Sequence, residues 1–163
     1  MKKIALVFAA VLLAAAMLCS CSGGSGESSK AESGKTLTQV FDDIRSQVKL
    51  EDFNIYKSEA SLDRFYGITE DDFSEYAGGI NSSGVNQEEI VLLKAKDDAA
   101  AKRIKEALDG RYESKLAQNK NYNQEQAAML EKCKVEQYDL YVTIIVSPEA
   151  EKITKIFKDD LGL

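Results

Sequence analysis

Residues 88–96 read Glu-Glu-Ile-Val-Leu-Leu-Lys-Ala-Lys, a stretch whose apolar side chains cover both faces of an extended chain. Strands with two apolar faces lie inside a sheet, so this stretch predicts a central strand. Residues 140–146, Leu-Tyr-Val-Thr-Ile-Ile-Val, predict a second central strand for the same reason. Alternating polar and apolar residues indicate an edge strand over 133–137, and a weaker strand is expected over 75–82. These stretches predict an antiparallel sheet of about four strands.

Residues typical of a helix start lie before and between the predicted strands along the chain. Thr36 and Gln39 have the spacing of a capping box, and the apolar residues that follow fall on one helical face. Asp97 and Asn123 are expected to cap a long and a shorter helix, because their side chains can accept hydrogen bonds from the first free N–H groups.

Two further helices complete the predicted order. A short helix over 61–66 ends at Gly67, and the last helix begins with Ser147 as its N-cap and Pro148 at its first position. The order of elements predicts the α+β class, a two-layer domain with helices mainly on one face of the antiparallel sheet. We expect one shared core, which contains Leu92, Ile104, Leu108, Ile144 and Phe157.

The N-terminus has the pattern of a secretory segment. Met1-Lys2-Lys3 is followed by a run of 15 apolar residues, which is shorter than the roughly 20 that a membrane-spanning helix needs. An ordinary cleaved signal or a short anchor would share these features. The residues that follow the core of the run, Leu18-Cys19-Ser20-Cys21, resemble the bacterial lipobox. The lipobox predicts a signal peptide over 1–20 and lipidation of Cys21, since Cys19 follows the bulky Leu18.

A lipidated Cys21 would carry two acyl chains, and two chains give stable membrane anchoring. The expected location is therefore the outer face of the cytoplasmic membrane. Residues 21–35 contain the lipidated Cys and a Gly/Ser-rich stretch, which predicts a flexible tether of roughly 20 Å. Residues 36–163 are expected to form a single domain, because their length suits one core.

The composition excludes several kinds of site. The chain contains no histidine, which removes Ser-His-Asp and Cys-His catalysis and His-ligated zinc. After processing and acylation, Cys133 is the one thiol that remains, and we interpret it as a small core residue. The net charge is −6, or −8 once Lys2 and Lys3 leave with the signal peptide, and such a chain is a poor match for nucleic acid.

Two groups of acidic residues are candidates for chemistry. Glu70, Asp71, Asp72 and Glu75 could hold a hard cation, but they lack the spacing of a calcium loop, so helix capping and solvation explain them better. Residues 88 and 89 are both Glu and could form an acid/base pair. Adjacent strand residues point to opposite faces, so we expect this pair to serve solubility at a sheet edge instead.

Charge is distributed unevenly along the chain. Residues 41–75 carry a net −6, whereas residues 94–120 carry a net +3. The two regions either complement each other within the fold or leave a basic helix that faces an anionic wall polymer or an acidic protein. Tyr66, Tyr122 and Tyr138 fall at the ends of predicted elements, where an amphipathic ring often marks a contact surface. They are our candidate partner contacts, with a basic-helix surface at Arg103, Lys105 and Arg111 as the alternative.

The lipobox and the tether occur together with an ordered set of segments: Phe65-Tyr66-Gly67-Ile68, residues 88–97, Tyr122 ahead of a capped helix, Leu140-Tyr141-Val142 and Ser147-Pro148. With this set, the chain as a whole resembles a family of small predicted lipoproteins of Gram-positive bacteria, the domain of unknown function 4358 family. The resemblance covers about 60–163 well and 36–59 loosely, and it implies secretion, lipidation and an α+β domain. It implies no catalytic residues.

We therefore expect a lipid-anchored, non-catalytic binding or accessory module outside the cell. The alternative is a receptor for a small ligand or a cell-wall component, and a third hypothesis is an enzyme that uses carboxylates and tyrosines. No catalytic residue, metal site or cofactor is predicted. The expected partners are the membrane, through the lipid on Cys21, and an extracytoplasmic protein or a wall polymer, with no nucleic acid.

Overall fold

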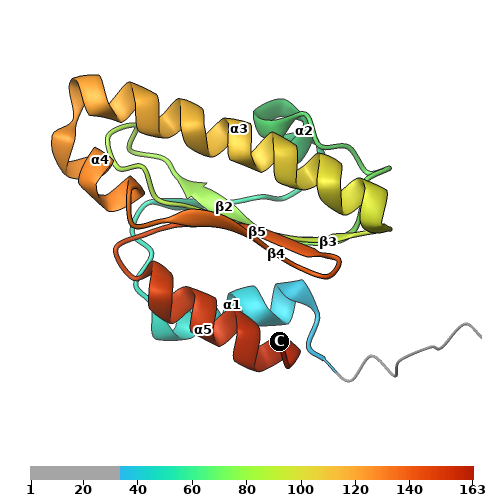
Figure 1. Cartoon of the computed structure of the whole chain (residues 1–163). Coiled ribbons are helices and arrows are strands. Elements are labelled where there is room, and N and C mark those ends of the chain that lie inside the picture. The colour runs from blue at the N-terminus through green and yellow to red at the C-terminus, as the bar shows by residue number, and fades with distance from the viewer. Residues whose placement is uncertain (1–33) are drawn as a thin grey trace, which may run out of the picture. The chain divides into compact units, whose positions relative to one another are not determined.

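The computed structural model describes residues 34–163, so the predicted signal peptide, Cys21 and most of the predicted tether lie outside the described residues (Figure 1). Within residues 34–163, no helix is long and apolar enough to cross a membrane. The elements in chain order are α1 (Leu37–Gln47), β1 (Phe53–Ile55), α2 (Ala60–Tyr66), β2 (Phe73–Asn81), β3 (Glu89–Ala95), α3 (Asp98–Tyr122), α4 (Gln124–Leu130), β4 (Lys134–Tyr138), β5 (Tyr141–Val146) and α5 (Ala150–Leu161).

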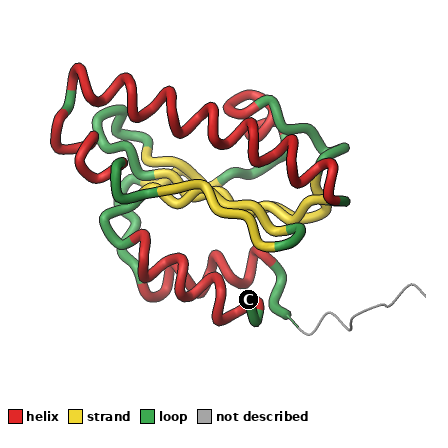
Figure 2. Tube along the Cα trace, in the orientation of Figure 1, coloured by secondary structure: helices red, strands yellow, loops and turns green. Residues whose placement is uncertain are grey.

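The strands form one antiparallel sheet in the order β1-β2-β3-β5-β4. Helices α2, α3 and α4 lie over one face of the sheet, and α1 and α5 cover the other (Figures 1 and 2). The predicted α+β class and antiparallel sheet are confirmed. The sheet has five strands rather than four, and helices cover both of its faces rather than mainly one. The domain therefore has three layers instead of the predicted two.

The sheet separates two cores. Side chains alternate along a strand, so Val91 and Leu93 of β3 point toward α3, whereas Leu92 points toward α1 and α5. The predicted single core is therefore wrong. Ile104, Leu108 and Ile144 lie in the core beneath α3, and Leu92 and Phe157 lie in the other core.

The predicted caps are largely confirmed. Thr36 and Gln39 form a complete capping box at the start of α1. Asp97 accepts a hydrogen bond from the Ala100 N–H at 2.7 Å and begins α3. Asn123 caps α4 in the same way.

Ser147 is not the N-cap of the last helix, which begins at Ala150. The Ser147 hydroxyl donates a hydrogen bond to the Glu88 carboxylate at 3.0 Å and accepts one from the Glu149 N–H. Ser147 therefore stabilises the turn before the helix and binds Glu88, and the helix begins three residues later than its predicted N-cap.

Strand β1 was missed because it is only three residues long and partly exposed. Two glycines of β2 allow β1 and β3 to lie on either side. A Cβ on Gly79 would collide with the Asn54 carbonyl oxygen and would lie 2.8 Å from the Phe53 ring. Gly78 has a φ of 138°, and a Cβ at this position would collide with the Ile90 carbonyl oxygen.

The start of the domain is held by an ionic contact. Lys35 Nζ lies 2.6 Å from Asp43 of α1 and 2.6 Å from Asp160 of α5. Gly34 lies against Leu161. The folded unit thus includes Lys35, one residue earlier than the predicted boundary at 36, and the first residues of the unit lie beside its last helix.

Candidate functional site

The least expected feature of the structure is a carboxylate inside the core. Glu89 is the first residue of β3, and its side chain is 0% exposed. It lies on the same face of the strand as Val91, so it points toward α3. The interpretation of Glu89 as a solubilising residue at a sheet edge is therefore wrong, because β3 has neighbours on both sides over its whole length.

Two cations on α3 neutralise this carboxylate. The Arg111 guanidinium donates through Nε to Glu89 Oε1 at 3.3 Å and through Nη2 to Oε2 at 3.2 Å. Lys115 forms an ion pair with Oε2, and its ammonium also donates to the Gln87 carbonyl at 2.8 Å. Residues four apart on a helix lie on one face, which explains how both cations reach a single carboxylate.

Tyrosine hydroxyls extend the cluster toward α2. Tyr66 donates a hydrogen bond to Glu89 Oε1 at 2.7 Å. Because its one proton is used there, its hydrogen bond with Tyr56 is donated by Tyr56. The Arg111 guanidinium lies 5.9 Å from the centre of the Tyr66 ring. Tyr66 is 9% exposed, so the prediction that it offers a contact surface fails.

These contacts set the ionisation of the cluster. Burial pushes the pKa of Glu89 up, but the charges and hydrogen bonds of Lys115 and Arg111 outweigh it, so its pKa lies below the usual range. Burial, the Glu89 charge and the hydrogen bonds raise the pKa of the Tyr66 hydroxyl, and burial raises that of Tyr56. Burial lowers the pKa of Lys115, against the pull of Glu89.

The cluster holds its members in fixed positions. Each Glu89 oxygen accepts two hydrogen bonds or ion pairs, and the tyrosines are held in their neutral form. Its members come from the strand, from α3 and from α2, so it ties both helices to the sheet. We assign it to fold specification, because a buried polar network is satisfied in only one arrangement.

The neighbouring carboxylate has separate partners. Glu88 is also buried, and it accepts hydrogen bonds from Ser147 at 3.0 Å and from Asn86 at 2.8 Å. The two carboxylates thus bind different groups and do not converge on one point, as the alternation of a strand predicts. Solubility does not explain Glu88 either.

The charges of α3 are largely matched within the fold. Arg103 pairs with Asp72 of the acidic region at 2.7 Å, and Lys105 pairs with Asp109 on α3 itself at 2.7 Å. With Arg111 on Glu89, all three residues of the alternative basic-helix surface have acidic partners in the chain. These contacts favour charge complementarity within the fold over a helix that awaits an anionic ligand.

Two of the four acidic residues considered for a cation, Asp72 and Glu75, have structural partners too. Glu75 accepts a hydrogen bond from the Leu37 N–H at 3.0 Å, and Asp72 is held by Arg103. Among residues 34–163, no group of three or more Cys, Asp or Glu residues is arranged to hold a metal ion.

Cys133 is buried, as predicted for a core residue. Its thiol donates to the Met129 carbonyl at 3.3 Å, and burial raises its pKa, which keeps it protonated and unreactive.

The other two candidate tyrosines differ sharply. Tyr138 is half-buried against Phe157, with ring centres 6.0 Å apart, and Lys158 lies 5.0 Å from its ring centre. Burial and the neighbouring Glu136 raise the pKa of Tyr138 to about 12. Tyr122, the last residue of α3, is 87% exposed.

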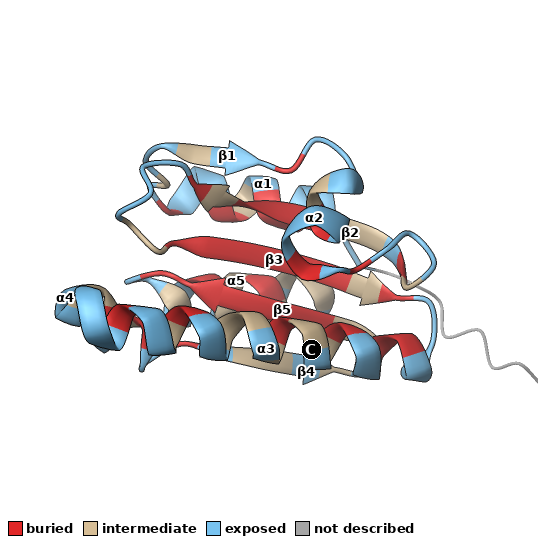
Figure 3. Ribbon diagram, turned by 90° about the horizontal axis from the view of Figure 1, so that it is seen from above, coloured by how far each residue is buried: buried red, intermediate tan, exposed pale blue. Residues whose placement is uncertain are grey.

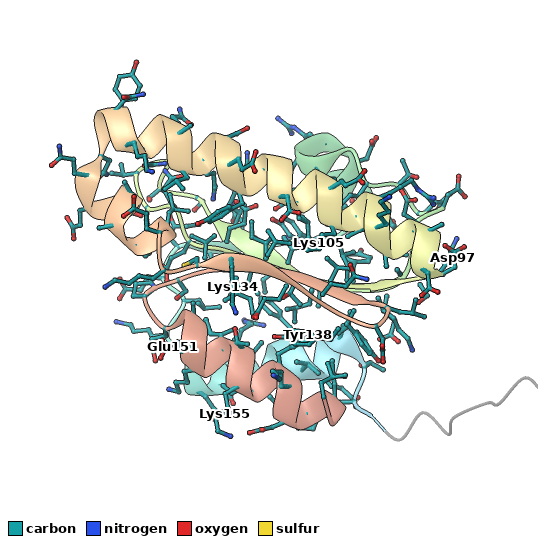
Figure 4. The ribbon with its side chains drawn as sticks, viewed as in Figure 1. Asp97, Lys105, Lys134, Tyr138, Glu151 and Lys155 are labelled. Atoms are coloured by element: carbon teal, nitrogen blue, oxygen red, sulfur yellow. The ribbon has the colours of Figure 1, made fainter. Side chains whose placement is uncertain are left out.

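Two adjacent hollows lie at the α5 side of the domain. One, of about 410 Å³, lies between α4 and the start of α5, and the other, of about 370 Å³, lies between β4 and α5. They share Lys132, Ala150 and Glu151. Figure 4 shows Lys134 and Tyr138 of β4 beside the second hollow, with Glu151 at the start of α5.

Comparison with known proteins places the chain in a family. No curated protein and no solved structure matches it. A family model, described as a domain of unknown function, matches residues 46–147, which is well over half of the chain. The matched region contains Tyr66, Glu89, Arg111 and Lys115. It ends at Ser147, before α5 begins. The chain belongs to the domain of unknown function 4358 family.

Proposed function

We propose that this protein is a lipid-anchored module at the outer face of the cytoplasmic membrane, which binds an extracytoplasmic protein without catalysing a reaction. The lipobox-like sequence ending at Cys21 supports the anchor. The exposed ring of Tyr122 carries the binding proposal, because a large aromatic residue that is 87% exposed gives no stability to the domain that bears it.

The position of Tyr122 suits such a module. Lys35 enters the domain beside α1 and α5, on one face of the sheet. Tyr122 ends α3, which lies on the other face, and it leads directly into α4 (Figure 1). A partner that contacts this corner would meet a surface away from the point where a membrane tether joins.

The hollow beside α4 supports a polypeptide partner. Its apolar lining comes from Ala128, Met129, Pro148 and Ala150, while charged, amide and hydroxyl residues form the rest. Methionine adapts to different partner shapes, and an apolar hollow with a polar rim is typical of a protein interface.

The alternative functions have less support. Two of the three lysines that line the β4–α5 hollow are engaged within the chain, which weakens a receptor for an anionic ligand: Lys134 pairs with Glu136, and Lys158 lies over the Tyr138 ring. The Glu89 cluster gives no support to an enzyme that uses carboxylates and tyrosines, because Glu89 is 0% exposed.

The binding proposal is tested with a photo-crosslinking residue at position 122 in native membranes. We expect a discrete crosslinked product from position 122. Leu163, a large apolar residue that is 41% exposed beside α5, is the matched control and should give none. Equal products from both positions, or none from position 122, would contradict the proposed surface.

The anchor is tested separately by labelling with a fatty acid. Cys21→Ser should abolish incorporation of the label and leave an unprocessed precursor, because the modified thiol is lost. Cys19→Ser removes a neighbouring thiol and should leave labelling intact. Label retained by the Cys21→Ser chain would refute the lipidation site.

A further inference from the structure

The sheet has one open edge of useful length. Among residues 34–163, β4 is the last strand of the sheet and pairs with β5 alone (Figure 3). The opposite edge strand, β1, has only three residues. Along β4, the Lys134 side chain is 72% exposed and Gln137 is exposed, so solvent reaches the edge.

The hydrogen-bond pattern shows which backbone groups this edge presents. The Ala95 N–H donates to the Leu140 carbonyl, so every second pair between β3 and β5 is hydrogen-bonded, including Val91 with Ile144. The backbone groups of Ile144 therefore face β3. Val135, which lies opposite Ile144, consequently directs its N–H and C=O outward, as does Gln137.

The charges of β4 are self-complementary in one register. Lys134 and Glu136 flank Val135, form an ion pair with each other at 2.6 Å and, like Tyr138, point to the α5 face of the sheet, so a second copy would share this pair rather than meet free charges. If a second copy pairs antiparallel about a two-fold axis at Val135, Lys134 lies opposite Glu136 of that copy, and the reverse also holds. An axis moved by one residue would place Lys134 opposite Lys134, or Glu136 opposite Glu136, and like charges directly opposite repel.

The surroundings leave room for the added strand. The β4–α5 hollow, of about 370 Å³, lies beside Lys134 and Glu136, where the side chains of a second copy would enter. On the other face of the sheet, α3 packs over β4 and Val135 joins the core beneath it, but Gln137 stays exposed at the edge.

We propose that the β4 edge is a self-association surface, through which two copies of this chain pair antiparallel about Val135. The paired sheets form one continuous sheet of ten strands. Two outward backbone hydrogen bonds join the Val135 residues, and two Lys134–Glu136 ion pairs select the register. Symmetric pairing uses the same surface on both copies, which is the commonest arrangement in homodimers.

Charge reversal tests this interface. Tagged and untagged full-length chains are mixed in detergent, and the untagged copy recovered with the tag is measured. Lys134→Glu and Glu136→Lys should each reduce recovery at least tenfold, because like charges then meet across the axis. When the two variants are mixed with each other, recovery should return, since each supplies the charge that the other now needs.

Two controls make the result decisive. Lys155→Glu reverses an exposed charge on α5 away from β4 and should leave recovery unchanged. Gln137→Pro removes an outward N–H that faces Cys133 of the second copy in this register, and it removes no bond to β5, so it should reduce recovery while the melting temperature is retained. A wild-type chain that never recovers its untagged copy overturns the proposal. The proposal is also overturned if Lys134→Glu and Glu136→Lys each recover as much untagged chain as the wild type does. It is overturned too if these two variants, mixed with each other, recover no untagged chain.

Discussion

Replacing Glu89 with glutamine is the sharpest test of the buried charge cluster. The substitution keeps the shape of the side chain but removes the negative charge, and Arg111 and Lys115 keep theirs. The formal charge of the three groups rises from +1 to +2. One Glu89 oxygen also becomes an NH2 group, which cannot accept the hydrogen bonds that both oxygens accept in the native protein.

The expected cost follows from burial. Removal of one partner from a buried ion pair typically destabilises a protein by about 3–5 kcal/mol, because a charge is left unpaired. Lys115 is 6% exposed and bears that cost fully, whereas Arg111 is 28% exposed and can turn toward water. We expect Glu89→Gln to lose about 3 kcal/mol, a large share of a typical total of about 5–15 kcal/mol.

Urea unfolding of the wild type and three variants measures this cost. Lys115→Met should cost only about 1 kcal/mol, because Arg111 and Tyr66 still hold Glu89. The double variant Glu89→Gln/Lys115→Met should be more stable than Glu89→Gln alone, since the unpaired cation is removed. A loss below about 1 kcal/mol for Glu89→Gln, or simple additivity in the double variant, would refute the coupling between these groups.

Three other properties follow from the structure. The depressed pKa of Glu89 gives stability that is present above about pH 4.3 and is lost as the pH falls further. The raised pKa of Tyr66 gives stability that is lost as the pH rises above about 10. The free energy of unfolding measured at a series of pH values should fall at both ends, and Tyr66→Phe should reduce the fall at alkaline pH. Gly79→Ala should cost about 1–3 kcal/mol through its collision with β1, and hydrogen exchange should show lost protection in β1 while the rest of the sheet stays protected. Leu108→Ala and Phe157→Ala should each lower the free energy of unfolding by about 2–5 kcal/mol. The two losses should add within about 0.5 kcal/mol in the double variant, because the sheet separates the two cores. Strong coupling between them in urea unfolding would contradict two independent cores.

Local signals in the sequence predicted the elements well. Caps such as Asp97 act within one turn of a helix, and the apolar faces of β3 and β5 are properties of a few adjacent residues. These signals do not say on which face of a sheet a helix packs. That choice depends on contacts between distant segments, which is why the two-sided covering and the two cores were missed.

The buried cluster shows the same limit more sharply. In the sequence, Glu89 directly precedes a run of apolar residues, a position typical of the polar residue at the end of a strand. Its partners, Arg111 and Lys115, lie more than 20 residues later on a helix with many other charges. Arg111 and Lys115 are four residues apart and so lie on one face of the helix. This spacing is the one sequence signal that could have indicated that both contact the same buried acidic residue. The position at an element end singled out both Tyr122, which is exposed, and Tyr66, which packs inside, so this signal alone does not separate surface from core.

The ionic contact at Lys35 determines how the domain would respond to a pulling force. A load applied to residues before Gly34 would reach Lys35 first, and through Asp160 it would pass directly to the C-terminal helix. The capping box and the hydrogen bond from Leu37 to Glu75 would resist next. Because Glu75 belongs to β2, the load would then reach the sheet at that strand as well as the first turn of α1. The start of the domain would therefore share a load among both helices of this face and the sheet beneath them.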